Sequence, residues 1–157
     1  SSGQASAYYS QPFFEAKGWV KKGGQKFNVT GSAWADHEWS SQFISKTQDG
    51  WDWFSLNFKT GEKLMLFQVR ENNKKNFYSG THIDANGNSR IIDSSQIQIS
   101  PINSKFISDY PTTWQIQIQH LNIDVKVQAI NPFSMMKTIS HVTSLLLCLT
   151  IFKYLPL

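Results

Sequence analysis

The chain has 157 residues, of which 40% are hydrophobic, 14% aromatic and 17% charged, and its formal net charge is +4. This length suits a single domain that can bury a core, and the aromatic content excludes a disordered chain. The lysines are scattered rather than clustered, which argues against a nucleic-acid partner, and the single cysteine, Cys148, excludes an internal disulfide.

Short strands separated by turn residues dominate the sequence. Gly, Asn or Asp stands in most of the connectors, and these residues accept the positive φ that tight hairpins need. Strands are expected at residues 13–20, 25–34, 41–48, 51–58, 63–70, 76–83, 95–100, 113–119 and 123–129. Strands at this spacing predict an all-β fold, an antiparallel barrel or sandwich.

Alternation within the strands predicts which side chains face inward. Trp114, Ile116 and Ile118 share one face, and the glutamines between them take the other. Asp52 has the parity of Phe54 and should therefore point inward. Residues 63–69 are apolar on both faces, so this strand needs cover on both sides.

The C-terminal end differs in kind. Alternation stops after Asn131, and Val142 to Phe152 is almost wholly apolar but only about half the length of a membrane span. Three interpretations remain open: a buried C-terminal helix, a membrane-associating end, or a tail that does not belong to the fold. Nothing at the N-terminus resembles a signal peptide.

In two stretches of the sequence, acidic residues stand between tryptophans. In "WADHEW", alternation places Asp36 and Glu38 on the face of Trp34, and His37 and Trp39 on the other face. A carboxyl group enclosed by indole loses solvation, which raises its pKa and suits a general acid; a neighbouring imidazole can relay the proton. The alternative is that the acids only bind backbone amides or a cation at a strand end.

The second stretch, "GWDWF", places Asp52 between Trp51 and Trp53. Arg70, one of two arginines, could pair with an inward acid such as Asp36, Glu38 or Asp52, in a structural role at least as readily as a catalytic one.

Motifs for bound groups are missing from the sequence. The four histidines are widely spaced, so no metal site is expected. The sequence contains neither a phosphate-binding loop nor a nucleophile motif, so it predicts no cofactor and no hydrolase triad.

Four blocks carry a family resemblance: "ASAYYSQPFFEAKGWV", "VTGSAWADHEWSS", "GWDWFSLNFKTGEKLMLFQVR" and "YPTTWQIQI". They resemble the AttH-like, lipocalin-like family, which includes predicted secreted hydrolases and is related to hydroxyneurosporene synthase, the carotenoid 1,2-hydratase. The resemblance covers Ala5 to Ala129. It implies a lipocalin-like (calycin-like) antiparallel β-barrel over residues 1–130, the second of two such domains, with the first domain as its missing partner.

The same resemblance leaves residues 131–157 as a non-family tail, with a short apolar helix, where the closing strands of the barrel would stand. Such a replacement suggests that the sequence is a truncated or frameshifted reading of a longer gene, and that the barrel is incomplete. The family also implies a secreted, periplasmic or cell-envelope location.

The functional expectation from the resemblance is a hydrophobic, isoprenoid-like ligand, with acid-catalysed hydration or a hydrolase-type activity. Protonation of an alkene needs a neutral acid in an apolar pocket and aromatic faces near the developing cation. The implied catalytic residues are Asp36, His37, Glu38 and Asp52, and the implied ligand-binding residues are Trp34, Trp39, Trp51, Trp53, Phe54, Arg70 and Trp114. The alternatives are a non-catalytic carrier or scaffold and, resting on the tail, a membrane-associated accessory domain.

Overall fold

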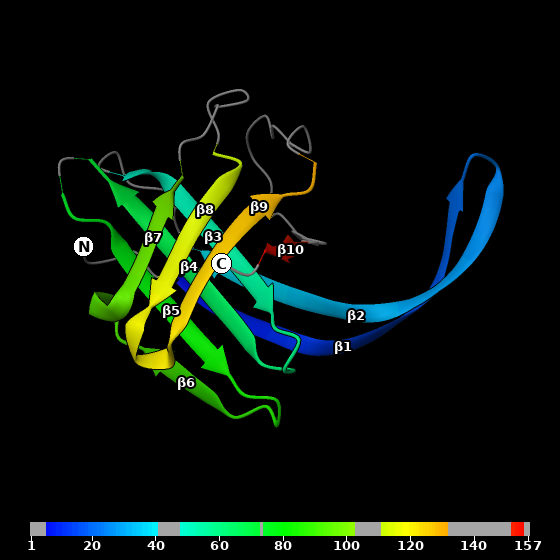
Figure 1. The fold of residues 1–157 in the computed structure, drawn as a ribbon, viewed down its shortest axis with the longest axis horizontal. Coiled ribbons are helices and arrows are strands. Elements are labelled where there is room, and N and C mark those ends of the chain that lie inside the picture. Colours follow the sequence, from blue (N-terminus) through cyan, green and yellow to red (C-terminus); the bar gives the residue numbers. More distant parts are fainter. Residues whose placement is uncertain (1–5, 41–47, 73, 103–110, 132–151, 156–157) are drawn as a thin grey trace. The chain divides into compact units, whose positions relative to one another are not determined.

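The structure is a computed structural model that describes residues 6–40, 48–72, 74–102, 111–131 and 152–155. Within these ranges the fold is antiparallel and all-β, with two short 3-10 helices, which confirms the predicted class (Figure 1). The elements are β1 (Ser6–Lys22), β2 (Gln25–Ser40), β3 (Gln48–Asn57), β4 (Lys63–Glu71), β5 (Phe77–Ile83), β6 (Ser89–Ile92), η1 (Ser94–Gln96), β7 (Ile97–Pro101), β8 (Thr113–Ile118), η2 (Gln119–Leu121), β9 (Ile123–Ala129) and β10 (Phe152–Leu155). They form two compact units, β1–β2 and β3–β10.

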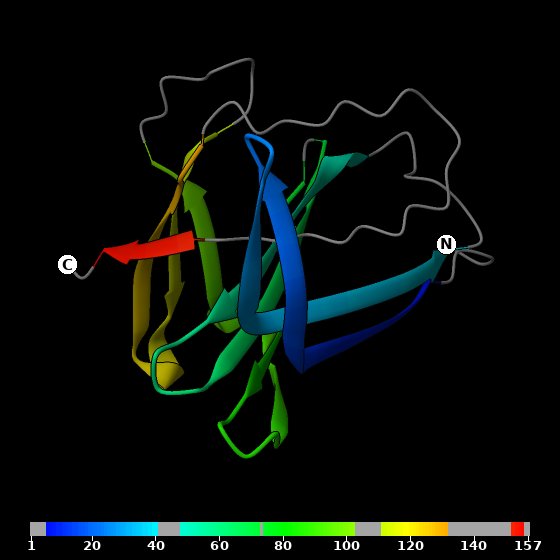
Figure 2. The same ribbon diagram turned by 90° about the vertical axis from the view of Figure 1, so that its right-hand side faces the viewer.

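The first unit contains a long curved ribbon made of β1 and β2 (Figure 2). Gly23 and Gly24, with φ of 57° and 83°, form the two-residue turn that the sequence predicts. Both strands are longer than predicted, because their pairing continues to Ser6 and Ser40 past an irregularity between Gln11 and Phe14. Pro12 lies in this irregularity, where its missing N–H interrupts no ladder bond.

The second unit contains two four-stranded sheets, ordered β3-β4-β5-β6 and β10-β9-β8-β7. Their inner faces share one apolar core. The strands of the described ranges do not close into a barrel; the arrangement is that of two packed sheets. The fully enclosed members of the core are Leu56, Leu64, Leu66, Ile116 and Ile118.

Two predictions about individual strands are confirmed. Ile116 and Ile118 are buried and Trp114 is half-buried, while the intervening glutamines are not buried; Ile97 and Ile99 alternate with Gln98 in the same way. β4 is buried on both of its faces, with Leu64, Leu66 and the oppositely directed Met65 all nearly inaccessible.

The predicted helical tail is not confirmed. The described residues of the tail, β10, form a strand that pairs antiparallel with β9 (Figure 2). The remainder of the tail, 132–151 and 156–157, lies outside the described residues, as do residues 41–47 of the strand predicted at 41–48. No helix in the described part of the chain is long and apolar enough to cross a membrane.

Candidate functional site

A pocket of ≈ 320 Å³ lies between β3 and the β8–β9 pair. Its lining is mainly apolar and includes residues that the sequence proposed as ligand contacts. The lining residues are Trp51, Asp52, Trp53, Phe54, Pro111, Thr112, Trp114, Val127 and Ala129. The Phe54 and Trp114 rings meet edge to face across the two sheets, 5.5 Å between centroids, as aromatic pairs in cores prefer.

Asp52 is the acidic residue of this lining, and it is held by two donors. Gln68 Nε2 donates to Asp52 Oδ2 at 2.7 Å, and Arg70 Nη1 forms an ion pair with the same oxygen. Gln68 is 2% exposed, and the Asp52 side chain is 16% exposed. The predicted inward orientation of Asp52 and its pairing with Arg70 are both confirmed.

Gly50 makes room for this ion pair. A Cβ at Gly50 would lie 2.6 Å from Arg70 Nη2, and φ of 143° at this glycine is a conformation that other residues rarely adopt. The guanidinium therefore occupies the space beside β3 where a side chain would stand.

Trp51 and Trp53, which flank Asp52 in the sequence, line the same pocket. Alternation directs Trp51 and Trp53 to the other face of β3, and Trp51 is 58% exposed. The aromatic neighbours on the face of Asp52 are instead Phe54, two residues along the strand, and Trp114 from the facing sheet.

Asp36 belongs to the first unit and accepts three hydrogen bonds on one oxygen. The donors to Oδ1 are Tyr8 Oη and Ser10 Oγ, each at 2.5 Å, and Trp34 Nε1 at 2.8 Å. The predicted sharing of a face by Trp34 and Asp36 is thus confirmed, but the indole acts as a hydrogen-bond donor as well as an apolar wall.

Tyr8 is the residue whose titration reports this network. Burial, and then its hydrogen bond to Asp36, raise the pKa of Tyr8 well above the ordinary value for tyrosine. Because the raised pKa favours the protonated phenol, its contribution to folding is present below about pH 10 and is lost at higher pH.

In an ultraviolet titration, Tyr8→Phe should therefore leave the tyrosinate signal near pH 10 unchanged. A reduced signal in the variant would contradict this expectation.

His37 and Trp39 lie on the opposite face of β2 from Asp36. Their rings stack, 4.2 Å between centroids, and Tyr9 completes the cluster at 5.8 Å from each of them. This confirms the predicted division of the two faces. It also places the imidazole away from the Asp36 carboxylate, so adjacency in sequence supplies no direct proton relay. Glu38 is exposed.

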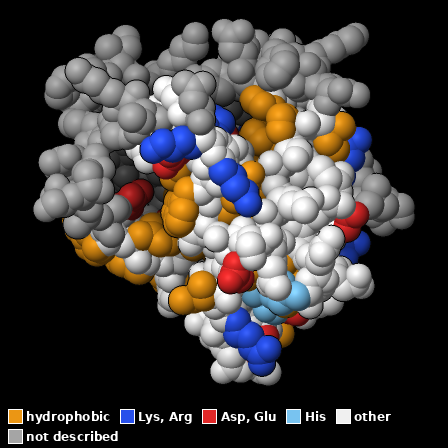
Figure 3. Space-filling view, turned by 90° about the vertical axis from the view of Figure 1, so that its left-hand side faces the viewer, with side chains coloured by type: hydrophobic (Ala, Val, Ile, Leu, Met, Phe, Trp, Pro, Cys, Tyr) orange, Lys and Arg blue, Asp and Glu red, His pale blue; other side chains and the backbone are white. Residues whose placement is uncertain are grey.

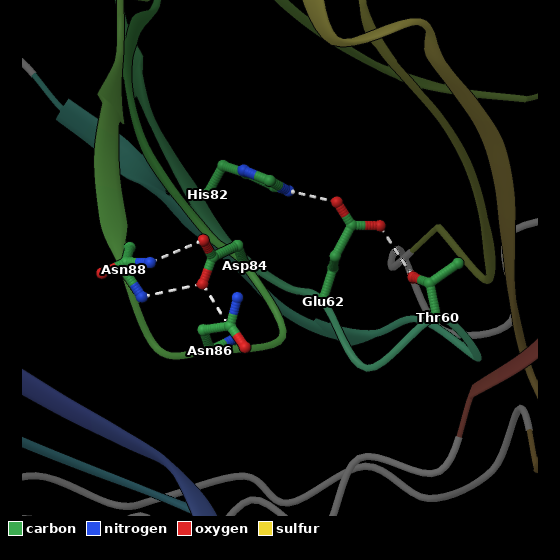
Figure 4. A network of polar contacts seen from close by, with 6 residues as sticks. All are labelled: Thr60, Glu62, His82, Asp84, Asn86 and Asn88. Atoms are coloured by element: carbon green, nitrogen blue, oxygen red, sulfur yellow. Dashed lines mark hydrogen bonds and ion pairs between the residues drawn. The ribbon is translucent and has the colours of Figure 1, made fainter.

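A third polar cluster lies at the ends of β4 and β5 (Figure 4). Glu62 accepts from Thr60 Oγ1 at 2.7 Å and lies 3.2 Å from His82 Nε2. The carboxylate stands between the hydroxyl and the imidazole, so His82 does not activate Thr60 as a base would activate a nucleophile. Beside it, Asp84 binds Asn86 and Asn88 in the β5–β6 turn, and the Asn88 hydrogen bonds lower the pKa of Asp84.

The face drawn in Figure 3 carries no large patch of like charge. Figure 3 shows a face on which Lys and Arg side chains lie in small separate groups. Among the described residues, no three His, Cys, Asp or Glu side chains come together as metal ligands would.

Sequence reasoning missed Tyr8, Ser10, Gly50 and Gln68 as parts of these sites. Gln68 follows from strand pairing, because it stands directly opposite Asp52. Tyr8 and Ser10 lie in the quoted "YYS" block, but the pairing that carries them to Asp36 depends on the irregularity at Pro12.

The fold and pocket define an antiparallel β protein with an aromatic cavity between two sheets. The model of the AttH-like family matches residues 1–145, and the chain belongs to this family. The crystal structure, at 2.00 Å, of a protein from Nitrosomonas europaea assigned as an AttH is similar, with 30% identity and a TM-score of 0.65. The match covers 78% of this chain and 39% of that one, so the chain spans well under half of this relative. No curated protein matches.

Proposed function

We propose that this chain binds a hydrophobic small molecule in the pocket between β3 and the β8–β9 pair. The observation that carries the proposal is the lining, in which Phe54, Trp114, Val127 and Ala129 surround a cavity with one held carboxylate. Ligand sites are typically apolar with a few fixed polar groups, and this lining has that composition.

The pocket size limits the ligand. Its volume of ≈ 320 Å³ lies at the lower end of the range of about 300–1,000 Å³ typical of small-molecule sites. An isoprenoid of modest length fits this description, and a longer polyene would extend through the pocket mouth.

Acid catalysis at this site would require more than binding. The Asp52 oxygen Oδ2 is already engaged by two donors, the guanidinium of Arg70 and the amide of Gln68. Asp36 accepts three hydrogen bonds on one oxygen, from Tyr8, Ser10 and Trp34. Hydration of an alkene therefore requires a rearrangement that simple binding does not.

Retinol, whose fluorescence rises in apolar surroundings, can test the proposed pocket. Ala129→Phe should weaken retinol binding by roughly ten-fold or more, because the ring fills space that the ligand needs. The matched control is Gln128→Phe, since Gln128 is the adjacent, exposed residue on β9 and is not part of the lining. Absence of binding to the unsubstituted chain, or equal binding by both variants, would contradict the proposal.

A further inference from the structure

The ribbon of β1 and β2 has one apolar face, which no described residue of its own unit covers. Strand pairing places Val20 opposite Phe27, Gly18 opposite Val29, and Phe14 opposite Ala33. Ala16 and Gly31 complete the set on the same side, which we call the apolar hairpin face. Its four large members, Phe14, Val20, Phe27 and Val29, are 41–50% exposed.

Exposure on this scale needs an explanation. A two-stranded ribbon in water is marginally stable unless one face packs against something. A contiguous exposed apolar surface, in contrast to single exposed side chains, marks an interaction site. The apolar hairpin face runs along the ribbon on both strands, so it is such a surface.

The charges around this face indicate the kind of partner. Between residues 14 and 33 there are four lysines, Lys17, Lys21, Lys22 and Lys26, and one acid, Glu15. Lys21 stands directly opposite Lys26, a like-charge pair that destabilises a hairpin unless an anion lies nearby. Glu15 is already beside Lys17, at 3.9 Å, which leaves the tip with no acid of its own among residues 16–33.

Trp19 adds a third feature at the same end. It lies on the lysine-bearing face, 58% exposed, with Lys26 Nζ 4.5 Å from its ring centroid. Trp19 and Lys26 thus lie on the ribbon face opposite the apolar hairpin face, and an apolar face backed by a face with lysine and tryptophan is typical of elements that lie in the headgroup region of a bilayer.

We propose that the tip of the β1–β2 hairpin binds the surface of an anionic lipid membrane. The apolar hairpin face contacts the acyl boundary, while Lys21, Lys22 and Lys26 contact the lipid phosphates, which offset the repulsion between the opposed lysines. Attraction to anionic lipid rises with each lysine near the surface and weakens with salt. A protein partner or a second copy of the chain could cover the apolar face, but neither accounts as directly for a tip that is uniformly basic.

Sedimentation with vesicles tests this proposal on the full chain. We expect binding to vesicles of equal parts phosphatidylglycerol and phosphatidylcholine, little binding to phosphatidylcholine alone, and release in high salt. Lys21→Glu should reduce the affinity at least about ten-fold, because it reverses one charge at the lipid surface. Phe27→Glu should abolish binding, since it places a charge in the apolar face.

Ile91→Glu is the matched control, because Ile91 is 88% exposed on β6, outside the ribbon. It should bind like the unsubstituted chain, and circular dichroism should show that all variants remain folded. Equal binding to neutral vesicles, no binding at all, or unchanged binding by a folded Lys21→Glu chain would overturn the proposal. A dimer in sedimentation equilibrium that Phe27→Glu dissociates, without vesicle binding, would assign the face to a second copy instead.

Discussion

Leu66→Ala is expected to lower the free energy of unfolding by about 3–5 kcal/mol. Leu66 is fully buried at the centre of the β3–β6 sheet, and its removal leaves a cavity in the shared core. Denaturant unfolding followed by tryptophan fluorescence measures the loss. Ile91→Ala is the control: Ile91 is 88% exposed, so the same kind of truncation should change stability by no more than about 0.5 kcal/mol. Equal losses for the two variants would contradict the core assignment.

Gly80 provides a second test of the packing around Leu66. A Cβ at Gly80 would lie 2.6 Å from Leu66 Cδ2 and 3.1 Å from Ile97 Cδ1, so Gly80→Ala alone overpacks the core and should cost about 1–3 kcal/mol. In the Leu66→Ala background the added methyl group enters vacated space, and its cost should nearly vanish. Additive losses would show that the two positions do not compete for one volume.

Periodicity in the sequence predicted the faces of the strands well. The positions of Ile97, Ile99, Ile116 and Ile118 follow from alternation, and so does the inward direction of Asp52, because a strand directs successive side chains to opposite faces. Short turns between most strands allowed the antiparallel class to be predicted. Closure into a barrel could not be predicted in this way, because it depends on how sheet edges meet, and alternation is the same in a barrel and in two packed sheets.

The surroundings of the acids were harder to predict. Alternation alone separates Trp51 and Trp53 from Asp52 along β3, but it does not identify Gln68, the donor to Asp52 from the neighbouring strand. On β1, the pairing passes from Phe14–Ala33 to Ser10–Asp36, four residues on one strand against three on the other. This one extra residue reverses which side chains of β1 face Asp36, so the hydrogen bonds from Tyr8 and Ser10 depend on a bulge that alternation alone does not reveal.

Arg70→Met should lower the free energy of unfolding by about 2–3 kcal/mol, because it leaves the largely enclosed Asp52 carboxylate without its cation. The figure is below the cost of about 3–5 kcal/mol for a fully buried pair, since the Arg70 side chain is 37% exposed and partly screened by water. The matched control is Arg90→Met, at the other, exposed arginine, which should be nearly neutral.

The double variant Asp52→Leu with Arg70→Met separates a structural ion pair from a functional one. Removing both charges avoids the unpaired carboxylate, so we expect the double variant to recover most of the stability lost in Arg70→Met. Asp52 lines the pocket and Gln68 donates to it, so the substitution also removes the acceptor that orients the Gln68 amide. If the ion pair only closes the wall of an apolar site, the stable double variant should still bind retinol. If Asp52 contacts the ligand, binding should be lost while stability is restored, and this outcome would assign the carboxylate to recognition instead of architecture.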